Sequence, residues 1–566
     1  MDMDMENENI DLKNRGLNLG KYAKLIVFGL ATVVFLGLSS SVNAINDTEG
    51  SDTDKKNESS VVNIDDELKD GPFDRLVIRG PMVIPGHGGP PVGPYDIVIE
   101  NDQIVDMISV DAITLQRTGD DFERPTGDIV IDAEGKFVMP GMIDLHMHLR
   151  FEPMPLEYVY YLKLAHGVTT MVPAPDRGLE NAMEEAARSD NNEIAAPRMF
   201  PIWGWGRNTG HDREFLENPD NALQVAREMV EMGAHVVSVG SIAWHPELFE
   251  AASRAVTEAG GITTVHLPPS SMPMTNAVEA ARRGVTMIEH HYGYAESSLD
   301  RRVQDFPREY DYDDESHRFR EAGRVWTEAN RERLLGEVAD SLVHYGVTML
   351  PTRVVYEANR DILRAISLPW HEKYTHQVLT DVNVPSPEWH GAYHWDWTND
   401  DEYYWYEAFD LWGKLIYEFN KRGGRVAYGT DDNYIWATPG FSNVRELQLI
   451  REAGLHNLEV IKTATYNSAR TLRRPDLGLV RPGYTADLLI VDGNPIKNTR
   501  FLYSFGALTT INNDPATMHR TQGITHTIKD GVVFDNAGMM REVERMVKES
   551  REGAESHMIF EPFLVD

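Results

Sequence analysis

Val138-Met-Pro-Gly-Met-Ile-Asp-Leu-His-Met-His148 is the most informative segment of this chain. It is apolar until it reaches a polar end, which predicts a buried strand, and Pro140-Gly141 marks the turn into it. Side chains of a strand alternate between its two faces, so His146 and His148 project to the same side. Two imidazoles at one strand end can hold a metal ion, although a lone His-x-His pair is weak evidence in a chain with 20 histidines.

The composition indicates a large, acidic, soluble protein. Its 566 residues are enough to bury a large core, and 54 Lys and Arg against 89 Asp and Glu give a formal net charge of -35. Such a surface repels nucleic acid and anionic membranes and attracts cations. The chain has no cysteine, so any metal must be held by histidine and carboxylate side chains.

The first 44 residues resemble an export signal. Basic residues precede an apolar stretch at 25–38, and small and polar residues follow as far as Ala44. The apolar stretch is short for a membrane span, although an uncleaved anchor, and with it a membrane-anchored receptor, stays open. Residues 45–72 are polar and acidic, which predicts a disordered spacer. We expect an exported, periplasmic or extracellular protein without stable membrane insertion after processing.

Short alternating strands lie towards both ends of the remaining sequence. Residues 73–138 contain Arg75-Leu-Val-Ile-Arg79, and residues 479–537 contain Ala486-Asp-Leu-Leu-Ile-Val-Asp492, each bounded by turn residues. We expect these two regions to assemble into one small β-sandwich. Residues 538–566 are expected to form a helical C-terminal tail, which could pack against a second copy of the chain in a homo-oligomer.

The middle of the chain, residues 139–478, alternates apolar runs with amphipathic helical segments. The runs predicted as strands are 138–146, 168–173, 198–203, 235–240, 262–266, 285–290, 347–351 and 425–430. Such βα units in order favour an α/β fold, a (β/α)8 TIM-type barrel flanked by the sandwich, with a doubly wound open sheet as the alternative. In a barrel the chemistry lies at the C-terminal ends of the strands.

Polar residues suited to metal binding end four of these strands. Besides His146 and His148 on the first strand, His266 ends the fifth, His290 the sixth and Asp431 the eighth. One histidine at a strand end is more often structural than a ligand, but that explanation does not account for the whole set. Nitrogen and oxygen donors with few carboxylates and no sulfur favour zinc, with manganese or iron behind.

These residues lie in motifs that resemble the amidohydrolase superfamily of metal-dependent hydrolases. The motifs are Pro-Gly-x-Ile-Asp-x-His-x-His at 140–148, Gly-Val-Thr-Thr at 167–170, Ile-Glu-His at 288–290, Gly-Thr-Asp at 429–431 and Gly-Tyr-Thr-Ala-Asp-Leu-Leu-Ile-Val-Asp-Gly-Asn-Pro at 483–495. The resemblance covers roughly 73 to 537 and is closest to the imidazolonepropionase-like and prolidase-like branch. It implies a barrel flanked by a β-sandwich built from both chain ends.

The resemblance also implies roles for the strand-end residues. His146, His148, His266 and Asp431 would hold metal, and His290 would be a further ligand or a substrate contact. Asp431 would take a proton from metal-activated water and return it to the leaving nitrogen or oxygen. The implied enzyme cleaves amide, peptide or cyclic C–N bonds in small molecules or short peptides, with Asp431 and His290 as catalytic residues.

The fourth predicted strand departs from the family pattern. Many relatives carry a carbamylated lysine there that bridges two metals, whereas this chain has Ser238 and no lysine between Lys163 and Lys373. We therefore expect one metal ion per chain, and a second metal with other ligands or a weakened site are the alternatives. Single-metal deaminases of this superfamily usually carry a glutamate shortly after the fifth-strand histidine, where it shuttles a proton. No acidic residue closely follows His266, which argues against a nucleobase-type deaminase.

Two other functions stay open. A lactonase or esterase would need the same metal and base, and only a substrate screen separates it from an amide hydrolase. A binding or scaffold protein that kept the fold and lost turnover is supported only by the missing lysine.

Three residues are weaker candidates for substrate contacts. Tyr292 could donate to an oxyanion, Arg353 could bind a carboxylate or form a salt bridge inside the barrel, and His211 lies in a loop that could approach the mouth. Residues 297–321 are highly charged, which predicts a solvated excursion.

A long insertion at 352–412 separates the last two predicted strands. It carries most of the tryptophans: Trp370, Trp389, Trp395, Trp397, Trp405 and Trp412. Long barrel loops often form lids, so these rings could wall the metal site, or they could pack the insertion's own small core.

Overall fold

A computed structural model describes the chain over residues 67–552, apart from 120–121, 150–151, 302 and 388–389. The expected export signal, most of the spacer and Trp389 lie outside the described residues. Within the described part, no helix has the length and apolar character needed to cross a membrane.

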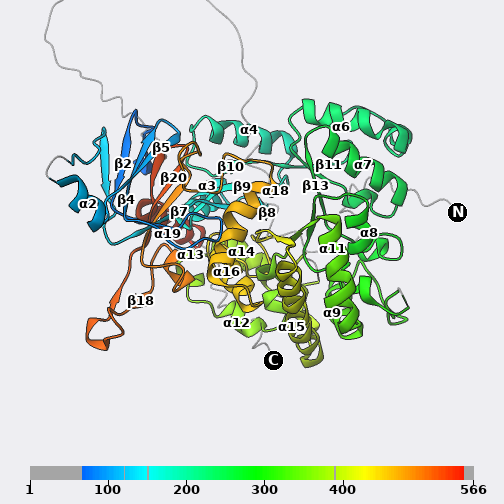
Figure 1. Cartoon of the computed structure of the whole chain (residues 1–566). Coiled ribbons are helices and arrows are strands. Elements are labelled where there is room, and N and C mark those ends of the chain that lie inside the picture. The colour runs from blue at the N-terminus through cyan, green and yellow to red at the C-terminus, as the bar shows by residue number, and fades with distance from the viewer. Residues whose placement is uncertain (1–66, 120–121, 150–151, 302, 388–389, 553–566) are drawn as a thin grey trace, which may run out of the picture. The chain divides into compact units, whose positions relative to one another are not determined.

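Parallel strands follow one another in chain order through the middle of the protein (Figure 1). They form the sheets β8-β9-β10 and β11-β12-β13-β14-β15-β16. Their bounds are β8 (Met142–His148), β9 (Val168–Ala174), β10 (Arg198–Met199), β11 (Ile202–Gly204), β12 (Val236–Ser238), β13 (Ile262–Val265), β14 (Met287–Glu289), β15 (Thr348–Leu350) and β16 (Arg425–Val426). The Leu145 N–H donates to the Tyr428 carbonyl at 2.9 Å, and the Thr430 N–H to the His146 carbonyl at 3.0 Å. The first strand is thus hydrogen-bonded to the segment that follows the last.

One apolar cluster draws on all of these parallel strands except β10 and β16. Its strand members are buried or nearly so: Ile143, Leu145, Val172, Ile202, Val236, Ile262, Met287, Leu350 and, just beyond β16, Ala427. Helices alternate with the strands along the chain (Figure 1): α3 (Leu156–Ala165), α4 (Leu179–Asp190), α6 (Ala222–Glu231), α7 (Pro246–Glu258), α8 (Ala277–Arg282), α9 (Glu315–Glu328) and α11 (Ala339–Tyr345). The predicted mixed α/β fold is confirmed.

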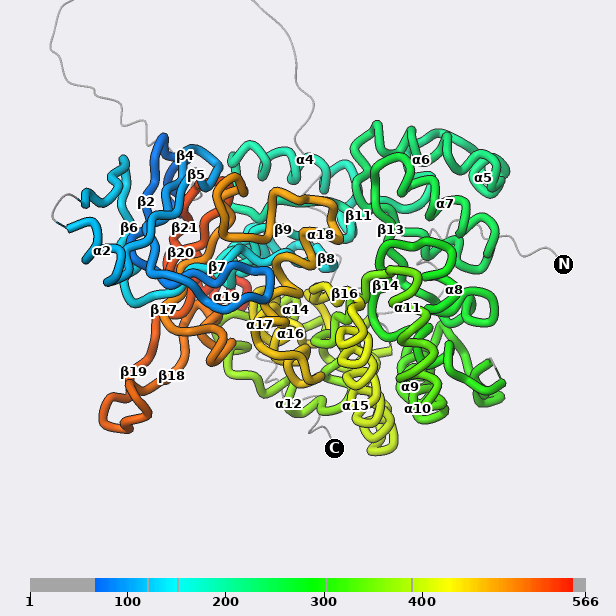
Figure 2. Tube along the Cα trace, viewed as in Figure 1, coloured from blue at the N-terminus to red at the C-terminus, as the bar shows by residue number. Residues whose placement is uncertain are grey.

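Two further sheets lie outside the parallel strands, and in the second of them strands from both ends of the described chain lie side by side (Figure 2). Their orders are β5-β4-β2-β6 and β1-β21-β20-β17-β7-β3. The bounds are β1 (Lys69–Asp70), β2 (Leu76–Arg79), β3 (Met82–Val83), β4 (Tyr95–Glu100), β5 (Gln103–Ser109), β6 (Ile129–Asp132), β7 (Phe137–Pro140), β17 (Leu488–Asp492), β20 (Gly523–Lys529) and β21 (Val532–Asp535). Leu76 and Ile97 of the first sheet share a buried cluster with Val138 and Leu488 of the second.

Segment 138–148 is two strands rather than the single strand that we expected. β7 pairs antiparallel with β17, whereas β8 pairs parallel with β9. Gly141 lies between them, and a Cβ atom there would come within 2.2 Å of Thr169 Oγ1. The backbone therefore changes sheets at a point where only glycine fits. The third predicted strand is also divided, into β10 and β11, around Pro201, which has no N–H to donate to a ladder.

The long insertion is helical. It contains η7 (Arg353–Asn359), α12 (Ile362–Ile366), α13 (His371–Tyr374), α14 (Gln377–Asn383), η8 (Tyr393–Asp396) and α15 (Asn399–Lys421). The remaining helices are α2 (Ala112–Thr118), α5 (Arg213–Leu216), α10 (Arg331–Arg333), α16 (Phe441–Glu452), α17 (Asn457–Lys462), α18 (Ser468–Thr471) and α19 (Asn536–Ser550). α19 packs on α3 and buries Met539, Val543 and Val547, so the apolar face of the described tail is used within the chain.

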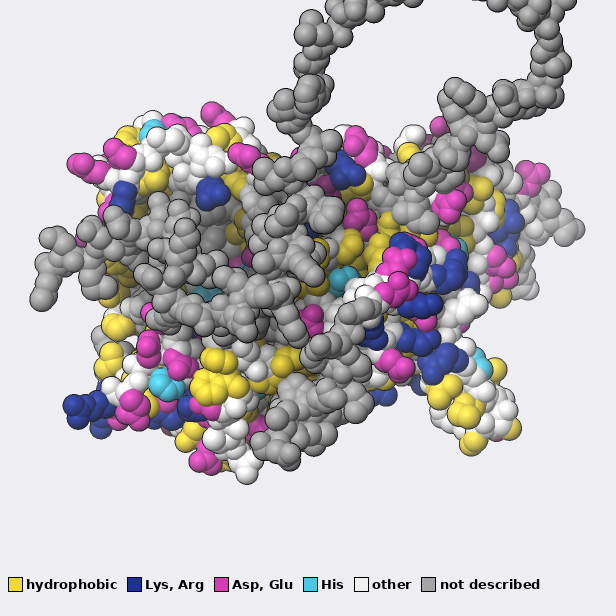
Figure 3. Space-filling view, turned by 180° about the vertical axis from the view of Figure 1, so that it is seen from behind, with side chains coloured by type: hydrophobic (Ala, Val, Ile, Leu, Met, Phe, Trp, Pro, Cys, Tyr) yellow, Lys and Arg dark blue, Asp and Glu magenta, His cyan; other side chains and the backbone are white. Residues whose placement is uncertain are grey.

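A hairpin of β18 (Leu508–Thr509) and β19 (His519–Arg520) projects from the rest of the described chain (Figure 2). Leu508, Ile511 and Met518 on it are 57%, 58% and 64% exposed. Apolar side chains are visible on the projection in Figure 3.

Arg198 ties the parallel strands to the sandwich. Its guanidinium donates to Thr170 Oγ1 and to Asp487 Oδ2, both at 2.8 Å, and it also pairs with Asp530. Burial lowers the pKa of Arg198, but the two carboxylates outweigh this effect and raise it. The arginine is therefore charged, and it neutralises two carboxylates that lie between the two halves of the fold.

We expect Arg198→Met to lower the free energy of unfolding by about 3–5 kcal/mol, because the substitution leaves Asp487 and Asp530 without their cation. Urea unfolding followed by circular dichroism measures the loss. Arg227→Met is the control, since Arg227 and Glu258 form an exposed pair whose side chains are 59% and 63% accessible. The control should cost less than about 1 kcal/mol. Equal losses in the two variants would contradict the assignment.

Candidate metal centre

All five predicted metal ligands contribute to the wall of one cavity of about 260 Å³. His146 and His148 belong to β8, His266 directly follows β13, His290 directly follows β14, and Asp431 lies beyond β16. The C-terminal ends of four strands, which lie far apart in sequence, thus bring these side chains together.

His146, His290 and Asp431 form a compact cluster within this wall. Their candidate ligand atoms all lie within 4.8 Å of one another. His146 Nε2 is 3.3 Å from Asp431 Oδ1, and His290 Nδ1 is 3.4 Å from Asp431 Oδ2. All three side chains are buried, so the cluster is screened from bulk water.

His148 and His266 lie beside the cluster. His148 Nε2 is 3.0 Å from Asp431 Oδ1, and its Nδ1 is 2.8 Å from Asp176 Oδ2. A carboxylate on the second ring nitrogen commonly orients a metal-ligating histidine. The His266 ring centroid is 4.9 Å from that of His290.

Three residues in the left-handed backbone region surround the cluster. His290, Thr352 and Asp431 have φ values of 62°, 47° and 53°, and they lie just beyond β14, β15 and β16. Non-glycine residues adopt this region at a cost of about 1–3 kcal/mol each, and such residues concentrate at functional sites. Thr352 Oγ1 lies 2.7 Å from His290 Nδ1, so two of these residues contact each other.

A buried ionic network lies on β8 just before the histidine pair. Lys163 Nζ in α3 donates to Asp144 Oδ2 at 2.8 Å and to Asp432 Oδ2 at 2.6 Å, and all three side chains have 0% exposure. Asp144 also accepts from the Thr430 N–H at 3.0 Å and from its hydroxyl at 2.7 Å. Burial lowers the pKa of Lys163, but the two carboxylates reverse this and raise it. The network therefore fixes β8 against the segment that carries Asp431.

The electrostatics of the cluster fit a divalent cation. Burial raises the pKa of Asp431, but the charges of His290 and His146 outweigh it and hold the pKa well below its usual range. Burial lowers the pKa of His290 well below its usual value, and it lowers that of His266 to about 3, with the charge of Arg318 as the next cause. Metal ligands must be an ionised carboxylate and neutral imidazoles, which these directions provide.

His146 has the electrostatic surroundings of a cation. Although burial lowers its pKa, Glu289 and then Asp431 raise it to about 9. Its buried Nδ1 has no hydrogen-bond partner among the described residues. The two carboxylates thus favour positive charge at this point, which the His146 proton supplies and which a metal ion would supply in its place.

Glu289 is a site residue that we did not predict. Its Oε1 lies 3.4 Å from His146 Nδ1 and accepts a hydrogen bond from Thr264 Oγ1. Strand alternation places neighbouring residues on opposite faces, so Glu289 and His290 are not expected to share a cavity. They do so because His290 leaves the extended conformation.

Connections between the strands complete the cavity wall. α9 contributes Arg318 and Phe319, η7 contributes Tyr356, and His390 and Tyr434 lie in loops. The prediction that 297–321 is a solvated excursion is wrong at its C-terminal end, because Phe319 is only 3% exposed.

The sequence profile of the Amidohydrolase family matches residues 416–534, a range that includes Asp431 and the sandwich strands β17, β20 and β21. Over this range the chain is similar to the amidohydrolase superfamily. The resemblance drawn from the motifs is thereby confirmed.

Relatives within the superfamily differ widely in activity. A dihydroorotase from Methanosarcina acetivorans is 25% identical over 211 residues, which is 35% of this chain and 40% of that protein. A solved Xaa-Pro dipeptidase with bound methionine has 17% identity and a TM-score of 0.52, over 81% of this chain and 100% of that one. The Aspergillus niger ochratoxinase structure has 16% identity and a TM-score of 0.51, over 82% of this chain and 96% of the ochratoxinase chain.

The chain spans only 18% to 40% of the length of the first curated relatives it matches. The structural likenesses, all under 20% identity, show a shared fold. Activity and substrate are therefore matters of proposal for this chain.

None of the three predicted substrate contacts lines the cavity that holds the candidate metal ligands. Tyr292 is 1% exposed, with its ring centroid 4.9 Å from that of His266. Arg353 is buried and donates to the carbonyls of Leu449 at 2.9 Å and Phe409 at 2.8 Å, so it is engaged in packing. His211 Nε2 lies 2.7 Å from Glu228 Oε2. The structure thus places each of these side chains outside this cavity wall, and their roles in substrate binding stay predictions.

The tryptophans of the insertion do not wall the site. Trp405 and Trp412 are completely buried and Trp370 nearly so, and no described tryptophan lines the cavity. Trp405 stacks on Tyr356 with ring centroids 5.6 Å apart. The tryptophan rings therefore form a core that supports a cavity residue.

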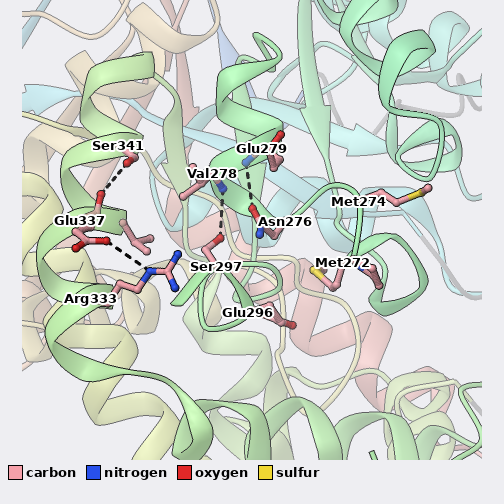
Figure 4. A pocket seen from close by; sticks show the side chains of 12 residues that line it. Met272, Met274, Asn276, Val278, Glu279, Glu296, Ser297, Arg333, Glu337 and Ser341 are labelled. Atoms are coloured by element: carbon pink, nitrogen blue, oxygen red, sulfur yellow. Dashed lines mark hydrogen bonds and ion pairs between the residues drawn. The ribbon is translucent and has the colours of Figure 1, made fainter. Parts of the chain in front are cut away.

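A second cavity of about 290 Å³ is shown in Figure 4. Its polar side chains are engaged with one another or with nearby backbone: Arg333 lies 3.6 Å from Glu337, and Asn276 accepts from the Glu279 N–H. None of the five candidate metal ligands lines it. This second cavity therefore adds no ligand to the candidate metal centre.

We expect Lys163→Met to lower the free energy of unfolding by about 3–5 kcal/mol, because Asp144 and Asp432 would lose their buried cation. Thermal and urea unfolding measure this loss. Lys421→Met is a matched control, since the Lys421 side chain is 62% exposed and only 3.9 Å from its partner Glu418. An unchanged unfolding midpoint in Lys163→Met would show that the network does not hold β8 in place.

Proposed function

We propose that this protein is a metal-dependent hydrolase that cleaves an amide, peptide or cyclic C–N bond in a small molecule or short peptide. The observation that carries the proposal is the buried cluster of His146, His290 and Asp431, which lies in a cavity at strand ends of an amidohydrolase chain. The names of its relatives, a dihydroorotase and a Xaa-Pro dipeptidase among them, support C–N bond hydrolysis.

The proposal includes a closed (β/α)8 barrel that carries one zinc ion. Hydrogen bonds from Leu145 to Tyr428 and from Thr430 to His146 support closure between the first and last strands. Ser238 lines the cavity where two-metal relatives carry a lysine, which supports a single metal. We assign His146, His148, His266, His290 and Asp431 as its candidate ligands.

Asp431 is proposed as the group that moves the proton. When bound, a divalent cation supplies a Lewis acid that polarises a carbonyl and acidifies water. The ionised Asp431 carboxylate can accept a proton at Oδ2, where the Tyr434 hydroxyl donates at 3.2 Å, and return it to the leaving nitrogen. His290 would hold the substrate carbonyl or the metal.

Export is a separate proposal, which rests on the composition of residues 1–44. Sequencing the N-terminus of the mature protein tests it. A mature chain that begins beyond Ala44 would support export and cleavage, and a retained apolar segment would favour an anchored protein.

Elemental analysis of protein purified without chelator should find close to one zinc per chain. We expect Asp431→Asn to lower kcat by about 10²- to 10⁴-fold, since the variant cannot accept the proton. A screen of amides, dipeptides and cyclic amides measures activity, with lactones and esters as the competing class. His211→Ala is the control, because His211 pairs with Glu228 outside the cavity.

Three results would contradict parts of this proposal. Close to two metals per chain would overturn the single-metal assignment. Turnover confined to lactones and esters would replace the reaction class. Less than about a tenth of a metal per chain, together with inertness after zinc is added, would favour a binding protein, because metal affinity depends on an intact ligand set.

A further inference from the structure

Arg318 is a cavity-lining arginine without an acidic partner. It contributes to the wall that holds the metal cluster, and no ion pair joins it to any carboxylate in the described chain. The other arginines of α9 are paired: Arg320 with Asp396 and Asp401, and Arg324 with Glu321 and Glu328. Acidic residues outnumber basic ones 89 to 54, so the missing partner does not reflect a shortage of carboxylates.

Aromatic rings hold Arg318, and part of its hydrogen-bonding capacity is left unused. Its guanidinium carbon lies 4.9 Å from the ring centroid of Tyr312 and 5.0 Å from that of Phe319. Its buried Nε atom has no hydrogen-bond partner among the described residues. Glu315, one turn earlier in α9, pairs instead with His390 and accepts from the Gly391 N–H at 2.7 Å. The Tyr292 hydroxyl interacts with the guanidinium, but no carboxylate among the described residues pairs with it, so Arg318 in the cavity wall can pair with an anionic ligand.

The helix that carries Arg318 is fixed in place. α9 packs against α15 (Figure 1), and the Trp405 indole N–H donates to the Phe319 carbonyl at 2.9 Å. Arg320 Nε donates to Asp401 Oδ1 at 2.7 Å, which adds an ionic tie between the two helices. A cation held on a rigid element loses less entropy when it binds an anion.

We propose that Arg318 binds a free carboxylate on the substrate, so that the preferred substrates are N-acyl amino acids or dipeptides with an apolar or aromatic side chain. This inference rests on the proposed function. A guanidinium fork matches a carboxylate with two parallel hydrogen bonds. Phe319, Tyr356 and Tyr434 in the same wall provide the aromatic surface for the side chain.

The charge of the cavity favours a carboxylate over a phosphate or phosphonate. Asp431 and Glu289 already place two carboxylates in the wall, and Arg318 is the only arginine or lysine that lines it among the described residues. A dianion would meet more repulsion than one arginine offsets. A cavity of about 260 Å³ also limits the substrate to a small molecule.

The test compares N-acetyl-L-phenylalanine with N-acetyl-L-phenylalaninol, which has the same scissile amide and no carboxylate. We expect Arg318→Met to raise KM for the acid about 10- to 100-fold with little change in kcat, since a charged hydrogen-bonded contact is lost from ground and transition states alike. KM for the alcohol should not change. Arg318→Lys should give an intermediate KM, because a lysine keeps the charge without the fork.

Controls separate binding from folding. Arg324→Met alters the same helix outside the cavity wall and should leave both KM values unchanged. Thermal unfolding of each variant shows whether the fold is retained. If Arg318→Met unfolds, the KM values of Arg318→Lys test the inference instead. The phosphonate analogue of the acid, used as a competing inhibitor, should bind more weakly than the carboxylate.

Calorimetry with the same two probes distinguishes failure of this inference from failure of the proposed function. Wild-type protein that hydrolyses the amides yet binds acid and alcohol equally well would overturn the role of Arg318 and keep the hydrolase. Wild-type protein that binds the acid at least about 10-fold more tightly, and loses this preference in Arg318→Met, would support Arg318 even without turnover. Tighter binding of the phosphonate would replace the carboxylate with a dianionic ligand.

Discussion

The geometry of the metal centre depends on Lys163 and the two carboxylates that it neutralises. Burying such a charge is costly unless every charged group is paired and hydrogen-bonded. Asp144 meets this condition through Lys163, through Thr430 and through the Asn443 amide at 2.8 Å. Because Thr430 directly precedes Asp431, the same contacts that satisfy Asp144 bring the last strand against the first. The histidine pair of β8 therefore faces Asp431.

This constraint also explains why the strand ends are distorted. His290 and Asp431 adopt positive φ values, which isolated residues of these types avoid. The buried network and the hydrogen bond between Thr352 and His290 fix the chain on both sides, so the surrounding structure compensates for the local strain. The result is a set of nitrogen and oxygen ligand atoms held close together in one cavity wall, which reduces the cost of reorganisation on binding.

The fold class and the five strand-end residues were predictable because their signals are local. An apolar run that ends in histidine is visible within about ten residues, and strand ends in α/β proteins converge on one edge. The cavity wall was not predictable in the same way. Arg318 and Tyr356 come from connections whose path depends on tertiary packing, and Glu289 enters only because His290 leaves the strand conformation. Arg353 illustrates that proximity to a strand end does not tell whether a side chain turns into the cavity or packs away from it.

The charges in the cavity link the number of metals to the kind of substrate. Two carboxylates, Asp431 and Glu289, face one guanidinium, Arg318, while burial favours neutral His266 and His290. One divalent cation together with one monoanionic substrate would leave this set of charges balanced. A second divalent cation would add positive charge, which a cavity of low dielectric tolerates poorly without a further anion such as a lysine carbamate. Ser238 supplies no such anion. A single metal and a substrate with one carboxylate are therefore mutually consistent consequences of the same wall.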